Sequence, residues 1–162
     1  MDLDFTVDVG DPLSGSLFYE DRAHSFRFVP GSPQELEERS GRRGLTSLSV
    51  GTLQIEVGVE TRLALFVWGL APKARWKTGG LDGPKPQPGI VHVTPSRAFS
   101  RGVSISVAEV GHWDSLFDET TGWLRVSAEE LSDTHQILIA TDTVLGLRDK
   151  SLTSVWLQPV FE

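Results

Sequence analysis

The first residues of the chain alternate between apolar and polar side chains. Within residues 2–9 each set occupies every second position, with Leu3, Phe5, Val7 and Val9 in the apolar set and Asp2, Asp4, Thr6 and Asp8 in the polar set. Because successive side chains of a strand point to opposite faces, this period of two predicts a strand with one buried side and one side facing water.

Similar patterns recur along most of the chain. Residues 16–29 predict a hairpin that turns near 21–23, and residues 53–59 alternate as the first segment does. Residues 63–71 are apolar on both faces, which predicts a central strand with Trp68 in the core. Further strands are expected within 89–93, 103–110, 122–126 and 135–160.

One segment has the signals of a helix instead. Ser32 can cap its N-terminus, Pro33 suits the first helical position, and Glu35 completes a capping box with Ser32. Gly41 is placed to end it. These signals predict a short helix near 33–40.

About ten short strands with a single short helix indicate an all-β fold, either an antiparallel β-sandwich or a partly closed barrel. No stretch of the sequence reads as a domain linker, so we expect one globular domain over residues 1–162. The longest connection, residues 69–89, contains Pro84, Pro86 and Pro88, which favour a stiff, extended segment. The sequence leaves open whether this loop is functional or only connects two strands.

The amino-acid composition excludes several classes of functional site. The 162 residues include no cysteine, which excludes disulfides, thiolate-bound metals and thiol nucleophiles. The formal net charge of −7 argues against nucleic acid as the main ligand, because phosphate binding depends on Lys and Arg. The chain lacks both the apolar run of about 20 residues that a membrane helix needs and the basic start of a signal peptide. We therefore expect a cytoplasmic protein with no membrane partner.

The charges are unevenly distributed. Between residues 62 and 101 the basic residues are opposed by Asp82 alone, whereas the flanking segments hold nearly all the other acids. Such a distribution either steers a charged partner toward the basic segment or is neutralised when the flanks fold against it.

Motifs of the common catalytic sites are missing. The KTGG at residues 77–80 lacks the Ser-x-x-Lys that accompanies it in penicillin-binding enzymes, and no Gly-Lys pair begins a phosphate loop. His112, Asp114 and His135 offer the residue types of a two-His, one-carboxylate iron site, although His112 and Asp114 also suit an ordinary polar loop. The sequence therefore predicts no catalytic residues, no metal and no cofactor.

Five tryptophans supply the candidate binding residues. Trp123 and Trp156 lie in predicted strands and are expected in the core. Trp76 and Trp113 lie in predicted loops, and Trp76 is flanked by Arg75 and Lys77. Exposed indoles are frequent anchors at interfaces, so Arg75, Trp76, Lys77 and Trp113 form the predicted binding site. The alternative is that each loop tryptophan folds back to close the end of the β core.

Three functional hypotheses follow. The first is a non-enzymatic, soluble protein-binding module, such as a small bacterial inhibitor, an immunity-type protein or an assembly accessory protein. The second is a β domain that binds a small ligand or a carbohydrate through Trp76 and Trp113. The third is a metal-dependent enzyme that uses His112, Asp114 and His135. The sequence favours the first, because its scaffold is compact and no catalytic motif is present.

Overall fold

The computed structural model describes residues 2–107, 113–128 and 132–162. Strands and one helix follow one another in the order β1 (Leu3–Asp8), β2 (Gly15–Glu20), β3 (Ser25–Pro30), α1 (Pro33–Ser40), β4 (Leu45–Val50), β5 (Leu53–Gly58), β6 (Ala64–Leu70), the 3₁₀ turn η1 (Lys73–Arg75), β7 (Lys77–Thr78), β8 (Gln87–Pro88), β9 (Ile90–Pro95), β10 (Ile105–Ser106), β11 (Trp113–Phe117), β12 (Leu124–Ala128), β13 (His135–Ala140), β14 (Thr143–Arg148), β15 (Ser151–Leu157) and β16 (Val160–Phe161).

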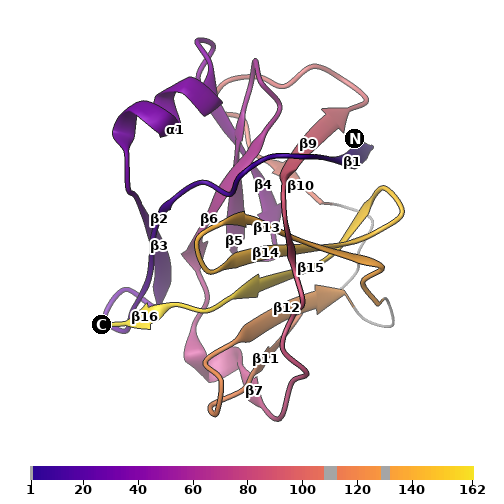
Figure 1. The fold of residues 1–162 in the computed structure, drawn as a ribbon. Helices are drawn as coiled ribbons and strands as arrows, with labels where there is room; N and C mark the ends of the chain where they lie inside the picture. Colours follow the sequence, from indigo (N-terminus) through magenta and orange to yellow (C-terminus); the bar gives the residue numbers. More distant parts are fainter. Residues whose placement is uncertain (1, 108–112, 129–131) are drawn as a thin grey trace.

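The strands form an all-β sandwich, which confirms the predicted fold class. The first sheet has the order β10-β4-β5-β6-β3-β2-β16 and the second the order β7-β11-β12-β15-β14-β13-β8, while β1 and β9 form a separate antiparallel pair. Strands of the two sheets run in clearly different directions (Figure 1). Within the described ranges no sheet closes into a barrel, so the sandwich alternative holds.

The four outer positions of the two large sheets share one feature. Each is occupied by a two-residue strand that pairs in parallel with its neighbour, namely β10 with β4, β16 with β2, β7 with β11 and β8 with β13. The inner strands pair antiparallel, as the sequence predicts. Short outer strands leave few unpaired backbone groups, which limits pairing with another molecule.

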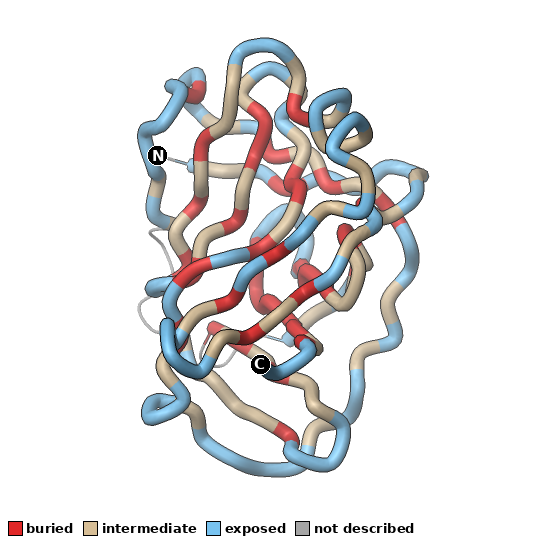
Figure 2. Tube along the Cα trace, turned by 90° about the vertical axis from the view of Figure 1, so that its left-hand side faces the viewer, coloured by how far each residue is buried: buried red, intermediate tan, exposed pale blue. Residues whose placement is uncertain are grey.

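The core lies between the two sheets and is built from the alternating apolar positions. Buried and exposed residues alternate along the strands in Figure 2. On β5, Leu53, Ile55 and Val57 are buried, and on β15 the inner face includes Val155 and Leu157. Burial of such side chains contributes about 1.5–3 kcal/mol each, which makes this core the main source of stability.

The predicted helix is confirmed as α1. The Ser32 hydroxyl accepts a hydrogen bond from the Glu35 backbone N–H at 3.2 Å, and Gly41 ends the helix with φ of 79°. The helix packs beside β5 and β6 at the end of the sandwich opposite β7 (Figure 1). No helix in the described ranges combines the length and apolar character that crossing a membrane requires.

Two predictions about tryptophans are wrong. Trp68 is 40% exposed rather than in the core, because β6 alternates and its opposite side already buries Val67. Trp113 lies at the start of β11 rather than in a loop. The segment 113–117 alternates between the two sides of the second sheet, a pattern hidden by its short length. Trp156 is buried, as predicted, and Trp123 is half-buried.

Candidate functional site

The loop between β6 and β9 joins both outer positions of the second sheet. Its first strand, β7, pairs with β11, and its second, β8, pairs with β13 on the opposite side. Between them, the Leu81 N–H donates to Asp118 Oδ2 at 3.0 Å and the Lys85 N–H donates to Gln136 Oε1 at 2.8 Å. The loop is therefore anchored to the sheet, and it forms part of the wall of a cavity.

Asp118 is the stronger of these anchors. The Leu81 N–H and the Thr120 N–H, which donates to its other oxygen at 2.9 Å, are the main causes that hold the pKa of this carboxyl below its usual value. Hydrogen bonds to the ionised form favour it, so Asp118 stays charged at neutral pH. Its role is to fix the loop.

Two adjoining cavities lie against this loop. The larger, which we call the outer cavity, has a volume of about 670 Å³ and lies on the outer side of the second sheet. The smaller, the end cavity, has a volume of about 300 Å³ and lies at the end of the sandwich, between the β4–β5 turn and β11. Both are lined by Lys77, Asp114 and Ser115. They lie mainly on opposite sides of β11 and adjoin at these three residues, and we call the two cavities together the groove.

All four residues of the predicted binding site line the end cavity. Arg75 and Lys77 are exposed, and Trp76 and Trp113 are half-buried. The structure therefore brings together residues that are up to 38 positions apart in the sequence, counting from 75 to 113.

Trp76 also closes the end of the core. Its ring lies 5.0 Å from Tyr19 and 5.2 Å from Phe117, measured between ring centroids. Aromatic pairs at these separations stabilise a core beyond the area they bury. Trp76 therefore packs on the core, as one of its two predicted alternatives expects, and it also lines the end cavity.

Two buried donors in the groove have no acceptor. Among the described residues, the Trp76 Nε1–H and the Arg125 Nε–H are the buried side-chain groups without a hydrogen-bond partner. Trp76 lines the end cavity and Arg125 the outer cavity. Because buried polar groups are nearly always paired, these two donors call for an explanation. Both nitrogens are shielded from the cavities, so a ligand would pair with them only after a shift of the side chain.

The outer side of the second sheet consists of cross-strand rows. One row passes through Asp114, Ser127, Ser154, Gly146 and Gln136, each paired with the next in the register of the sheet. Side chains directly opposite each other on neighbouring strands lie about 4.5–5.5 Å apart. The row is therefore a polar band across the floor of the outer cavity.

The neighbouring row contains Leu116, Arg125 and Trp156. The Arg125 guanidinium lies over the Trp156 ring, 5.7 Å from its centroid. Arg125 is held by this cation–π contact, and among the described residues it forms no ion pair. No carboxylate of the described residues therefore neutralises its charge.

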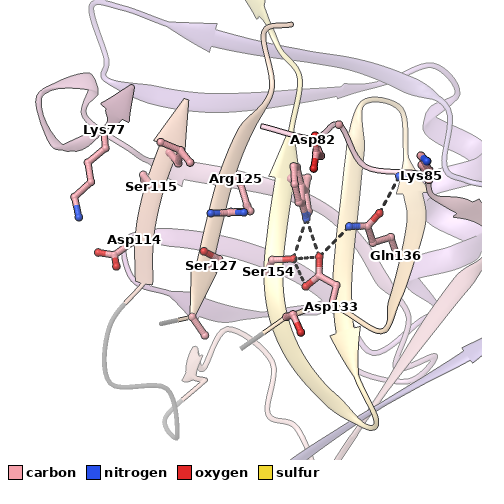
Figure 3. A pocket seen from close by; sticks show the side chains of 15 residues that line it. Lys77, Asp82, Lys85, Asp114, Ser115, Arg125, Ser127, Asp133, Gln136 and Ser154 are labelled. Carbon is pink, nitrogen blue, oxygen red and sulfur yellow. Dashed lines mark hydrogen bonds between the residues drawn. The ribbon is translucent and has the colours of Figure 1, made fainter. Parts of the chain in front are cut away.

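Asp133 accepts hydrogen bonds at the side of this cavity, as Figure 3 shows. Thr153 Oγ1 donates at 2.6 Å, Ser154 Oγ at 2.7 Å, and Gln136 Nε2 and Trp156 Nε1 each at 3.1 Å. Burial raises the pKa of this carboxyl, but the four donors together outweigh burial and hold the pKa below its usual value. Asp133 is therefore ionised at neutral pH.

The local sequence explains how Asp133 fits. The register between β14 and β15 shifts after Gly146–Ser154, so that Thr153 is an extra residue and both hydroxyls reach the same carboxylate. A Cβ at position 146 would overlap the Asp133 carboxyl group and the Ser154 hydroxyl. Gly146 thus makes room for the carboxylate to lie against the sheet.

The iron site of the third hypothesis is not assembled by the described residues. His112 lies outside them, and Asp114 and His135 stand on β11 and β13, which are four strand positions apart. At about 4.8 Å per position the separation is roughly 19 Å, too far for one ion. The described residues contain no group of three potential metal ligands.

Sequence reasoning missed Arg125, Asp133 and Ser154. The sequence carries no periodic signal for Ser154, because polar and apolar residues do not alternate along 151–157. Nothing in the sequence shows that a bulge turns Thr153 toward Asp133. Comparison with protein-family models gives no match, and comparison with curated proteins gives none either.

Proposed function

We propose that the chain is a non-enzymatic protein-binding module, and that the groove receives an extended segment of a partner protein. The observation that carries the proposal is the pair of unpartnered buried donors, Trp76 Nε1 and Arg125 Nε, in two adjoining cavities. An extended polypeptide rises about 3.4 Å per residue, and its successive carbonyls point to alternate sides, so one segment offers an acceptor to each side at every second residue.

The charged residues that line the groove indicate which side chains the partner segment carries. Lys73 is paired with Asp21 at 2.6 Å, so it does not contribute to a free basic surface. Arg75, Lys77 and Arg125 line the groove without an ion pair among the described residues. Asp82, Asp114 and Asp133 offset the charge in the outer cavity, whereas in the described lining of the end cavity Asp114 is the single acid beside Arg75 and Lys77. We expect a segment that carries one or more carboxylates, because Arg and Lys pair with them.

The test is affinity purification with matched charge reversals. The site variant is Arg75→Glu combined with Lys77→Glu. The control is Arg42→Glu combined with Arg43→Glu, which makes the same change in charge on exposed residues near α1. We expect the wild type and the control to retain one stoichiometric partner that the site variant loses. The difference should be larger at low salt than at high salt, because screening weakens exposed charges.

Equal recovery by both double variants would place the interface elsewhere and refute the proposed site. Photo-crosslinking from position 77 then gives a second readout, because a partner segment in the groove must lie beside it. The finer expectation, an inhibitor or immunity-type protein that blocks its target, becomes testable once the partner is known.

The outer cavity supports a second candidate, a small polar ligand. Its volume of about 670 Å³ lies in the range of about 300–1,000 Å³ typical of small-molecule sites, and its floor is a row of polar side chains. Sugar stacking on Trp156 is disfavoured, because this indole is only 4% exposed. Titration with oligosaccharides, monitored by NMR of the backbone amides, separates this candidate from the first. Shifts of amides that line the outer cavity would favour the small ligand.

A further inference from the structure

The outer side of the first sheet carries an apolar cavity that shares no lining residue with the groove. Its volume is about 330 Å³. It lies where β3 and β6 diverge, since their described pairing is limited to Ser25–Leu70 and Phe26–Gly69. The cavity is lined by Phe26, Arg27, Phe28, Glu56, Phe66 and Trp68.

Aromatic rings form most of its walls. Phe28 and Phe66 are stacked with ring centroids 5.2 Å apart and an angle of 14° between the rings. Trp68 is 40% exposed beside them, which is unusual for so large an apolar side chain. The face of an aromatic ring carries partial negative charge and attracts cations, most strongly for tryptophan.

One carboxylate lies among these rings. Glu56 is half-buried, and its Oε1 accepts a hydrogen bond from Trp68 Nε1 at 2.9 Å. Burial raises the pKa of Glu56 and the hydrogen bond from Trp68 only partly opposes this. A carboxylate among apolar groups is costly unless an opposite charge compensates it.

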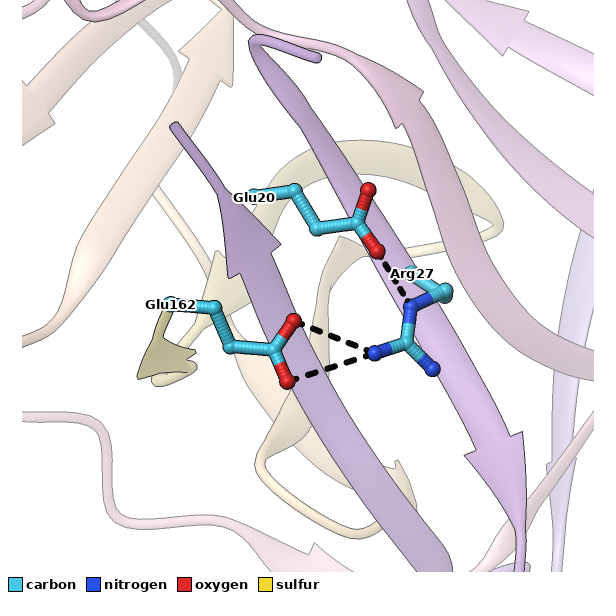
Figure 4. A network of polar contacts seen from close by, with 3 residues as sticks. All are labelled: Glu20, Arg27 and Glu162. Atoms are coloured by element: carbon cyan, nitrogen blue, oxygen red, sulfur yellow. Dashed lines mark hydrogen bonds and ion pairs between the residues drawn. The ribbon is translucent and has the colours of Figure 1, made fainter. Parts of the chain in front are cut away.

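The neighbouring cation does not supply that charge. Arg27 is the basic residue of the lining, but its guanidinium is paired with Glu20 at 2.6 Å and with Glu162 at 3.1 Å, as Figure 4 shows. It also lies over the Phe18 ring, 4.7 Å from the centroid. Two carboxylates and one guanidinium leave this network net negative, which adds to the charge of Glu56.

We propose that this cavity binds an organic ammonium group, with Glu56 as its counter-ion and the faces of Phe66 and Trp68 as its aromatic contacts. The combination of aromatic walls with one compensating carboxylate is the arrangement that recognises alkylated amines. A free quaternary amine and a lysine side chain of a partner both present this group. The site is independent of the groove, so either proposal can fail without the other.

Calorimetric titration tests this with two probes, choline and N-acetyl-lysine methylamide, which represent the two sources. We expect at least one to bind in the millimolar range, and the tighter of them indicates the source. The neutral control is 3,3-dimethylbutan-1-ol, which has the shape of choline without its charge. It should bind at least about tenfold more weakly, the factor that corresponds to about 1.4 kcal/mol.

Two variants test the residues. Glu56→Gln keeps an acceptor for the Trp68 indole but removes the charge, and Trp68→Leu keeps an apolar contact but removes the ring. Each should weaken binding of the cation about tenfold. Glu119→Gln, an exposed carboxyl on the turn between β11 and β12, should change nothing. The proposal is overturned if neither cation binds the wild type, if the alcohol binds equally well, or if Glu56→Gln binds as the wild type does.

Discussion

Asp133 is expected to stabilise the second sheet strongly. In the variant Asp133→Ala, the hydroxyls of Thr153 and Ser154 and the indole N–H of Trp156 lose their shared acceptor. These three residues are 0%, 2% and 4% exposed, so water reaches their donors poorly. The Asp133 carboxylate is thus the acceptor on which this part of the sheet depends.

The size of the effect follows from the number of donors left without a partner. Each buried unsatisfied group costs about 1–3 kcal/mol. The Trp156 Nε1–H also lies 2.9 Å from Ser154 Oγ, so these two can still bond to each other. The Thr153 hydroxyl then bears most of the loss, and removal of a buried charge offsets part of it. We expect the free energy of unfolding to fall by about 2–4 kcal/mol.

The loss should depend on pH in one direction. The pKa of Asp133 is lowered in the folded protein, so its contribution is fully present above the unfolded value, about 3.9, and is lost as the pH falls through the folded value. Urea unfolding of wild type and variant at neutral and at acid pH measures this. Asp82→Ala, an exposed carboxylate of the same cavity, is the control and should change stability by less than about 0.5 kcal/mol. A loss below about 0.5 kcal/mol for Asp133→Ala, or a loss equal at both pH values, would refute the role given to this carboxylate.

Three further predictions concern single residues. Trp76→Ala should lower the free energy of unfolding by about 3–5 kcal/mol in urea unfolding. Trp76→Phe should cost less than about 1.5 kcal/mol, because it keeps an aromatic ring in the core, and should still weaken partner binding, because it removes the indole donor. Arg125→Met should leave the free energy of unfolding in urea unchanged or raise it, because the variant removes a buried donor that has no acceptor among the described residues. It should also reduce retention of the partner. A clear fall in the free energy of unfolding would show that Arg125 has a structural role. Glu56→Gln should raise the free energy of unfolding, measured by thermal unfolding at neutral pH, by less than about 1 kcal/mol, because the raised pKa of Glu56 makes its ionised form unfavourable in the folded protein. The gain should disappear below about pH 4.3, where Glu56 is also protonated in the unfolded chain. A gain that persists there would contradict this cause.

The fold was largely predictable because its signals are local. Alternation along β5 and the cap formed by Ser32 and Glu35 depend on neighbouring residues, and both appear as predicted. The parallel outer strands were not predictable, because two residues such as Lys77 and Thr78 carry no period. The pairing of β7 and β8 depends on the path of the loop between β6 and β9, which is set by the positions of those two strands.

The sequence likewise indicated some residues of the candidate site and not others. Arg75, Trp76, Lys77 and Trp113 were chosen for their residue types, and the fold brings all four to one cavity. Asp133 could not be chosen, because its importance depends on a bulge in β15 and on the space left by Gly146. Neither feature can be deduced from the composition of the segment.

The central claim is that the groove holds a ligand through its two unpartnered donors. Nitrogen-15 NMR of the side-chain N–H groups, recorded with and without the purified partner, tests it most directly. We predict that the Trp76 Nε1–H and Arg125 Nε–H signals shift on binding, while the Trp68 Nε1–H, already bonded to Glu56, does not. A shift confined to Trp68, with Trp76 and Arg125 unchanged, would contradict the account.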